Sequence, residues 1–390
     1  MADKHIHFSE AELAERRQKA QAAMVAGGLD AILMFRQESM YYLTGYDTFG
    51  YVFFQTIVLT ADGRMLLFTR SADQRQAQFT SVVGDIRIWV DREGANPSAE
   101  LKGLLEEMKL KGAKIGVEYE AYGLTGRNAK RLDEALAGFA TLSDASDLVS
   151  KLRLVKSSSE IAYIRKAAEL CDAAWFKAVE LTKPGVSEGD VLAGMHSTIL
   201  KGGGDDPANE FIIGSGTGKL SGAMMCRYFT GRRTLEKDDH MTLEFAGVYR
   251  HYHSCLFRTI RLGATLDRQL DLYKAARESL IACEQSLRPG KTVGDVFEAH
   301  AAKLDKAGLK NYRLNACGYS LGATYAPNWM DWPMINAGSP IVIEPGMVFF
   351  LHMIIFDTDA GIPASVGRTS LVTDRGCEIL SKADLALTVK

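Results

Sequence analysis

The chain repeats one pattern twice, as KPGVSEGDVLAGMHSTILKGG (residues 183–203) and RPGKTVGDVFEAHAAKLDKAG (residues 288–308), and this pair decides the expected architecture. The proline and the aspartate of the first copy recur in the second at an offset of 105 residues. Each copy has the pattern of a helix, a Pro-Gly break and another helix, followed by long β-rich segments. Two such α/β halves packed face to face predict one pseudo-symmetric domain, with a cleft between their sheets where a binding site is common.

A smaller α/β domain is expected before the duplicated segment. Residues 9–30 have the pattern of an amphipathic helix that ends at a Gly-Gly pair, and residues 31–35 predict a buried strand. Residues 56–69, TIVLTADGRMLLFT, predict a β-hairpin because a turn sequence joins two apolar runs. Another strand is expected at residues 114–119.

The boundary between the two domains falls near residue 150. The segment after it, KLRLVKSSSEIAYIR, places three serines before a glutamate at the start of a long helical pattern, which is typical of a helix N-terminus. We therefore expect an α/β domain over residues 1–150 and the duplicated domain over residues 151–390. Two glycine-rich stretches, KGGGDDPANEF and IGSGTGK, lack the spacing of a phosphate-binding loop and predict turns or cleft loops.

The composition argues against several classes of function. Of the 390 residues, 47% are hydrophobic and 24% are charged, and the net charge of −2 gives no electrostatic reason to expect nucleic-acid or membrane-surface binding. No apolar run is long enough to span a bilayer, and the polar N-terminus lacks the apolar middle of a signal peptide. The six cysteines form no CxxC pair, which favours a reducing compartment. We expect a cytoplasmic globular protein.

The stretch LEFAGVYRHYHSC, residues 243–255, holds the main candidates for chemistry. On a strand, His251, His253 and Cys255 alternate onto one face, because side chains repeat every second residue. Glu244 lies eleven residues before the cysteine, on the expected neighbouring strand. A metal site, an acid–base site and an ordinary core all fit this pattern.

Two longer blocks are similar to a known family. TLEFAGVYRHYHSCLFRT (residues 242–259) and GYSLGATYAPNWMDW (residues 318–332) resemble segments of ectoine hydrolase, in the metal-independent branch of the creatinase and Xaa-Pro dipeptidase family. The resemblance implies a pita-bread fold from about residue 151 to the end, with a small creatinase-type α/β domain before it. It also implies a homodimer in which the small domain of one subunit borders the active site of the other.

The resemblance also implies which positions bind metal in the metal-dependent members. Their five ligands fall here on Glu244, Cys255, Tyr319, His352 and Gly367. None of the five keeps the residue type of the peptidases, and a tyrosine and a glycine in place of a histidine and a glutamate do not hold a pair of metal ions. We therefore expect no metal and no other cofactor.

A catalytic histidine of the family is replaced by an arginine. Creatinase and its relatives carry a histidine seventeen residues before the Glu244 position, and here that residue is Arg227. Arginine, with a pKa above about 12, does not act as a general base, but it can hold a carboxylate with two hydrogen bonds. A solvated basic face is the alternative for Arg227 and Tyr228. The strand histidine of ectoine hydrolase lies two residues later here, at His352, on the same strand face.

Glu244 is the expected nucleophile or general base, and an ion pair with an arginine is its structural alternative. His253 and His352 are the expected proton carriers, each with a place in the core as the alternative. Cys255 is a nucleophile only if His253 lowers its pKa, and otherwise fills the core. The expected substrate-binding residues are Arg227, Tyr228, Cys255, Tyr319, Trp329, Tyr46 and Tyr51.

The leading hypothesis is a metal-independent hydrolase that cleaves a C–N bond of a small polar nitrogen compound that bears a carboxylate. One alternative is a catalytically silent binding protein built on a peptidase fold, which the missing histidine at Arg227 favours. The other is an atypical metal-dependent Xaa-Pro peptidase that uses a Glu/His/Cys set. The expected partner is a small-molecule substrate, with no nucleic acid and no membrane involved.

Overall fold

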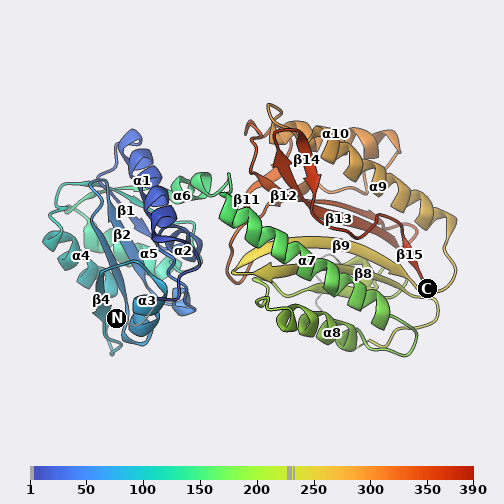
Figure 1. The fold of residues 1–390 in the computed structure, drawn as a ribbon, viewed down its shortest axis with the longest axis horizontal. Coiled ribbons are helices and arrows are strands. Elements are labelled where there is room, and N and C mark those ends of the chain that lie inside the picture. Colours follow the sequence, from blue (N-terminus) through green and yellow to red (C-terminus); the bar gives the residue numbers. More distant parts are fainter. Residues whose placement is uncertain (1–3, 226–230, 232) are drawn as a thin grey trace. The chain divides into compact units, whose positions relative to one another are not determined.

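The structure, a computed structural model, describes residues 4–225, 231 and 233–390 (Figure 1). The chain divides into two compact units between Arg153 and Leu154, three residues beyond the boundary expected from the sequence. Every helix that the structure describes is too short or too polar to cross a membrane.

The N-terminal unit is an α/β domain built on a six-stranded sheet. The strand order is β4-β3-β2-β1-β5-β6, and β1–β2 and β2–β3 are the antiparallel pairs, so the expected hairpin is present. Side chains of β1 pack into separate apolar clusters on the two faces of the sheet, Leu33 with α4 and α5 and Ile32 with α1 and α2. Burial on both faces explains why this strand is entirely apolar. The elements are α1 (Glu10–Ala26), β1 (Ala31–Met34), α2 (Gln37–Thr44), a 3₁₀ turn (Gly50–Val52), β2 (Thr56–Thr60), β3 (Met65–Arg70), a second 3₁₀ turn (Ser71–Asp73), α3 (Gln74–Thr80), β4 (Asp85–Trp89), α4 (Pro97–Glu107), β5 (Lys114–Val117), α5 (Gly126–Leu136), β6 (Thr141–Asp144) and α6 (Ser146–Leu152).

Over the described residues, the C-terminal unit has one nine-stranded sheet and four long helices. The strand order is β11-β10-β12-β13-β9-β8-β7, with β14 beside β13 and β15 beside β9. The strands of the two halves therefore join in a single sheet through β13 and β9, instead of forming two separate sheets with a cleft between them. The elements are α7 (Ser158–Leu181), α8 (Glu188–Lys201), β7 (Ile212–Ser215), a 3₁₀ turn (Gly222–Met224), β8 (His240–Tyr249), β9 (Tyr252–Arg261), α9 (Asp267–Ser286), α10 (Val293–Lys306), β10 (Ala316–Ser320), β11 (Asp331–Asn336), β12 (Val348–Asp357), β13 (Ile362–Thr373), β14 (Gly376–Ile379) and β15 (Thr388–Val389).

The duplicated pattern gives two equivalent helix pairs, α7–α8 and α9–α10. Gly185 and Gly290 end the two Pro-Gly breaks with φ of 88° and 82°, a left-handed backbone that favours glycine. The second helix of each pair then starts at a matching N-cap, since Ser187 and Thr292 both accept a hydrogen bond from a backbone N–H of the first turn. The pseudo-symmetry is thus fixed by local chemistry at equivalent positions.

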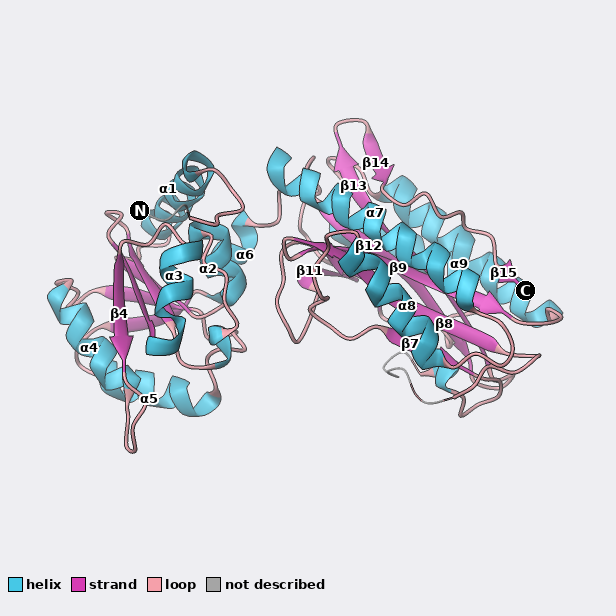
Figure 2. Ribbon diagram, turned by 60° about the horizontal axis from the view of Figure 1, so that its bottom comes forward, coloured by secondary structure: helices cyan, strands magenta, loops and turns pink. Residues whose placement is uncertain are grey.

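The helices pack on one face of the sheet (Figure 2). At Gly247, on β8, a Cβ atom would lie 2.1 Å from the carbonyl oxygen of Ala167 on α7, so only glycine allows this close approach. Leu351 and Met353 of β12 pack into the apolar cluster that α9 and α10 supply. The cross-strand pairing puts all these positions on the same face, which leaves the opposite face of the sheet for other contacts.

The β8–β9 hairpin corrects one detail of the sequence prediction. Arg250 and His251 form its two-residue turn with φ of 52° and 66°, a pair of left-handed residues that matches the twist of a tight hairpin. His251 therefore lies on the turn and not on a strand. His253 and Cys255 do lie on β9 and share one face, opposite Val248 and Ala246 of β8.

Candidate active site

A cavity of about 420 Å³ opens on the face of the C-terminal sheet opposite to the face that packs against α7, α9 and α10. One carboxylate, one imidazole and two large aromatic side chains line it, together with four asparagines and several apolar side chains. The lining residues are Glu244, His352, Tyr319, Trp329, Asn209, Asn315, Asn328, Asn336, Ile212, Leu314, Ala316, Met330, Met334 and Ile354.

Strand register brings distant parts of the sequence to this face. Glu244 pairs with Phe257 across β8 and β9, and directly opposite residues share a face of a sheet. Gly367 of β13 lies opposite both Phe257 and His352, so the imidazole reaches the same face from β12. Cys255, two residues before Phe257, lies on this face as well. Positions that the resemblance assigned to metal ligands therefore converge.

Tyr319 connects the carboxylate to the aromatic wall. Its hydroxyl accepts a hydrogen bond of 2.8 Å from Nε1 of Trp329 and donates one of 3.3 Å to Oε1 of Glu244. Burial raises the pKa of Tyr319 well above its usual value, and the nearby Glu244 acts in the same direction. The phenol therefore stays protonated and donates. The ring of His352 lies beside it, with 5.5 Å between the ring centroids.

His253 is held by backbone groups on both sides of its ring. The N–H of Ala208 donates to Nε2 at 3.0 Å, so the proton is on Nδ1, which faces the carbonyl oxygen of His251 at 2.8 Å and Thr324 Oγ1 at 3.2 Å. Burial lowers the pKa of His253 to about 3, which keeps the ring neutral. The ring is absent from the cavity lining. This geometry agrees with the alternative prediction of a core role, in which His253 connects the loops of Ala208 and Thr324 to the β8–β9 hairpin by hydrogen bonds.

Cys255 is buried beside the cavity. Its backbone N–H donates to Thr369 Oγ1 at 2.8 Å. Burial raises the pKa of the Cys255 thiol well above its usual value, and Cys171 and Glu244 raise it further. A nucleophilic cysteine needs its thiolate form. Cys255 is therefore a thiol in this environment, which agrees with the alternative prediction that its side chain fills the core.

The five positions do not fit the pair of metal ions that the family's peptidases carry. Glu244 offers a carboxylate and His352 an imidazole, while Gly367 offers no side chain. Tyr319 and Cys255 are buried and keep their protons, since burial raises the pKa of each. A single carboxylate cannot bridge and flank two ions held about 3.5–4 Å apart.

The remaining predicted residues lie elsewhere. Arg227 and Tyr228 are outside the described residues. Tyr46 is fully buried in the core of the N-terminal unit, where its hydroxyl donates to Gln55 Oε1 at 3.2 Å. Tyr46 is therefore a core residue of this unit, and not the pocket-wall residue that the sequence led us to expect. Tyr51 lies in a 3₁₀ turn of the same unit and is largely buried.

Four asparagines that line the cavity were missed as functional candidates. Asn328 lies within the block GYSLGATYAPNWMDW and Asn209 within the glycine-rich stretch KGGGDDPANEF, so a signal existed for these two. Asn315 directly precedes β10 and Asn336 is the last residue of β11, and neither lies in a comparable motif. Their amides add neutral donors and acceptors to the walls.

The chain is similar to known proteins over nearly its whole length. Residues 162–374 match the metallopeptidase family M24, and residues 16–155 match the creatinase/prolidase N-terminal domain. Ectoine hydrolase of Halomonas elongata is 26% identical over 402 residues, which cover 99% of both chains. Xaa-Pro dipeptidase of Pyrococcus horikoshii is 25% identical over 377 residues, which cover 96% of this chain and 98% of the dipeptidase. The crystal structure of a prolidase from Thermococcus sibiricus superimposes with a TM-score of 0.87 at 20% identity, over 98% of this chain and 100% of the prolidase, a likeness that concerns the fold.

Proposed function

Because the chain belongs to the metallopeptidase family M24, we propose that it is a hydrolase, and that it cleaves a C–N bond of a small polar nitrogen compound without a metal ion. One observation carries the proposal. At the positions that resemble a metal-ligand set, a protonated Tyr319 donates a hydrogen bond to the carboxylate of Glu244 at the wall of a cavity. A carboxylate held in this way is suited to attack or to activate water, and the residues around it do not suit a metal pair.

Glu244 can perform the reaction by either of two routes. As a general base it takes a proton from water, whose oxygen then bonds to the substrate carbon while the C–N bond breaks. As a nucleophile its own oxygen bonds to that carbon, and water releases the product in a second step. In both routes the departing nitrogen needs a proton, and His352 is the imidazole in the cavity lining that is placed to supply it.

The cavity walls favour a small, planar, cationic group as the part of the substrate that reacts. A carboxylate attracts an amidinium, and aromatic side chains such as Trp329 and Tyr319 in the lining can stabilise a cation that lies over a ring face. The volume of about 420 Å³ is within the range of small-molecule sites. A cyclic or open amidine fits these properties, in line with the full-length similarity to ectoine hydrolase.

The test is a screen of amidines, ureido acids and cyclic amino-acid derivatives, read by mass spectrometry with EDTA present. We expect turnover that EDTA does not reduce, and loss of turnover by at least 100-fold in Glu244→Gln. Glu298→Gln on the exposed side of α10 is the matched control and should keep full activity. Turnover of Xaa-Pro dipeptides that requires added Mn²⁺ or Co²⁺ would overturn the metal-independent proposal, and binding of a compound without turnover would point to a binding protein.

A single turnover in H₂¹⁸O tests the nucleophilic route. If Glu244 is the nucleophile and water then attacks the carboxyl carbon of Glu244 in the covalent intermediate, the label enters the peptide that contains Glu244 and the product keeps the unlabelled oxygen. If Glu244 is a general base, the label enters only the product.

A further inference from the structure

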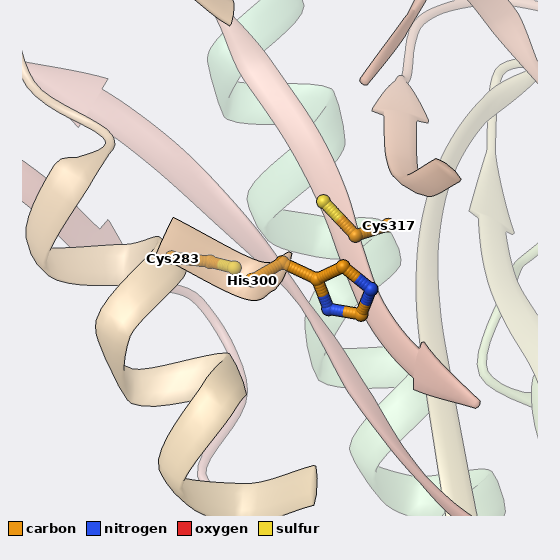
Figure 3. A group of neighbouring side chains, drawn as sticks. All are labelled: Cys283, His300 and Cys317. Atoms are coloured by element: carbon orange, nitrogen blue, oxygen red, sulfur yellow. The ribbon is translucent and has the colours of Figure 1, made fainter. Parts of the chain in front are cut away.

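Two cysteines and a histidine meet on the helical side of the C-terminal sheet, on the face opposite the Glu244 cavity. Cys283 comes from α9, His300 from α10 and Cys317 from β10, and one potential ligand atom of each lies within 4.8 Å of the other two (Figure 3). All three side chains are buried. Among the residues that the structure describes, no other group of three His, Cys, Asp or Glu side chains meets in this way.

The histidine is in the form that binds metals. Burial lowers the pKa of His300 to about 4, and Arg313 acts in the same direction, so the imidazole is neutral. Its Nδ1 lies 3.1 Å from Ser279 Oγ and 3.0 Å from Met353 Sδ. A neutral imidazole keeps one ring nitrogen as an acceptor, and that nitrogen can bind a cation.

The cysteines suit a soft cation. Cys283 Sγ lies 3.6 Å from the carbonyl oxygen of Val296, and burial and then the Cys283 side chain raise the pKa of Cys317. A bound ion displaces thiol protons and takes up thiolates in their place. Two thiolates balance the charge of Zn²⁺, so the occupied site would add no net charge to the apolar core around it.

We propose that Cys283, His300 and Cys317 form a structural binding site for a thiophilic d¹⁰ cation, Zn²⁺ or Cu⁺. Metal–sulfur bonds of about 2.3 Å and metal–nitrogen bonds of about 2.0 Å place ligand atoms less than about 4 Å apart, so the three side chains draw together by about 1 Å on binding. Met353 Sδ, beside the imidazole, is a thioether donor of the kind that Cu⁺ accepts. The site would fix both helices of the second half to β10.

The site is separate from the proposed catalysis but supports it. Cys317 precedes Tyr319 by two residues, and an irregularity in the β10–β11 pairing lies between Ala316 and Tyr319. The irregularity lets Cys317 face the helices while Tyr319 faces the cavity. An ion at Cys317 therefore anchors the strand that carries the partner of Glu244, without touching the substrate.

The experiment measures metal per chain in the intact protein, purified under reducing conditions from medium with added zinc or copper. We expect about one ion per chain in the wild type and at least a tenfold loss in Cys283→Ser and Cys317→Ser. The control Cys377→Ser, on β14 outside the group, and Glu244→Gln should both keep the ion. Zinc in the first medium or copper in the second identifies which cation the site takes.

Two results would overturn the site. One is a wild-type chain that holds no tightly bound zinc or copper and melts at the same temperature with and without them. The other is an ion that is lost in Glu244→Gln but kept in Cys317→Ser, which would put the metal in the cavity and also overturn the metal-independent function. If the serine variants fail to fold, wild-type protein refolded with Co²⁺ provides the test, because thiolate ligands give an intense near-ultraviolet charge-transfer band. The absence of that band overturns the site.

Discussion

Replacing Tyr319 with phenylalanine removes one oxygen atom and two hydrogen bonds from the cavity. The hydroxyl accepts from Trp329 Nε1 at 2.8 Å and donates to Glu244 Oε1 at 3.3 Å. The aromatic ring is retained, so its edge contact with Phe350 and its contact with His352 remain. The change therefore tests the hydroxyl alone.

The expected loss of stability comes from Trp329. Its N–H is buried and loses its acceptor, which costs about 1–3 kcal/mol of unfolding free energy. Glu244 faces a cavity that admits water, and water replaces part of the lost bond there. The expected loss of rate comes from Glu244, because a hydrogen bond to a charged group contributes about 1.5–3 kcal/mol. If that bond holds the carboxylate for attack, kcat falls by about 10- to 100-fold, at about 1.4 kcal/mol for each factor of ten.

Urea unfolding and steady-state kinetics with EDTA present measure the two effects. Tyr312→Phe is the matched control, since its hydroxyl donates to Asp359 at 2.8 Å on the surface. We expect the control to change the unfolding free energy by no more than about 0.5 kcal/mol and to leave kcat unchanged.

An unchanged kcat in Tyr319→Phe would refute the role of the phenol in holding Glu244. An unchanged unfolding free energy would refute the bond from Trp329. The two outcomes are independent, because one concerns the aromatic wall and the other the carboxylate.

Three further predictions concern the framework. Gly247→Ala should destabilise the fold by about 3 kcal/mol or more in urea unfolding, because its Cβ would lie 2.1 Å from the Ala167 carbonyl oxygen and 2.3 Å from the Cys171 nitrogen; a loss below about 1 kcal/mol would contradict this packing. His253 has a folded pKa of about 3 against 6.5 when unfolded, so it contributes stability above pH 6.5 that is lost as the pH falls toward 3. His253→Asn should flatten the fall in urea midpoint over this window, and an unchanged slope would contradict it. The chain should behave as a homodimer in light scattering, in keeping with the creatinase-like resemblance, and a monomer at all concentrations would refute this.

The sequence predicts the architecture well because its determinants are local. A Pro-Gly break, a left-handed glycine and a side-chain N-cap can each be recognised within a few residues, and each occurs twice. The strand positions of Glu244, Tyr319 and His352 also follow from local alternation once the strands are known. Local alternation does not predict that the strands of the two halves join edge to edge in one sheet.

The predictions for the hairpin histidines had a different weakness. The turn at Arg250 and His251 contains neither glycine nor asparagine, the residues that usually mark a turn of this type, so the sequence gives no signal that the strand alternation stops there. The hydrogen bonds that hold His253 come from the N–H of Ala208, 45 residues earlier, and from Thr324, 71 residues later. Partners so far away in the chain cannot be predicted from the spacing of residues around His253. The sequence therefore does not tell whether this histidine is hydrogen-bonded in the core or free to act in catalysis.

Gly367 shows that the altered ligand set is built into the packing of the sheet. The resemblance places a metal-binding glutamate at this position. Here a Cβ atom would lie 2.7 Å from the carbonyl oxygen of Leu351 and 3.0 Å from Cα of His352, so β12 approaches β13 more closely than any side chain at 367 allows. The same approach helps to place His352 on the cavity face, opposite Gly367. A glutamate restored at 367 would push on the strand that carries the imidazole, so recovering one metal ligand would displace a residue of the proposed acid–base pair.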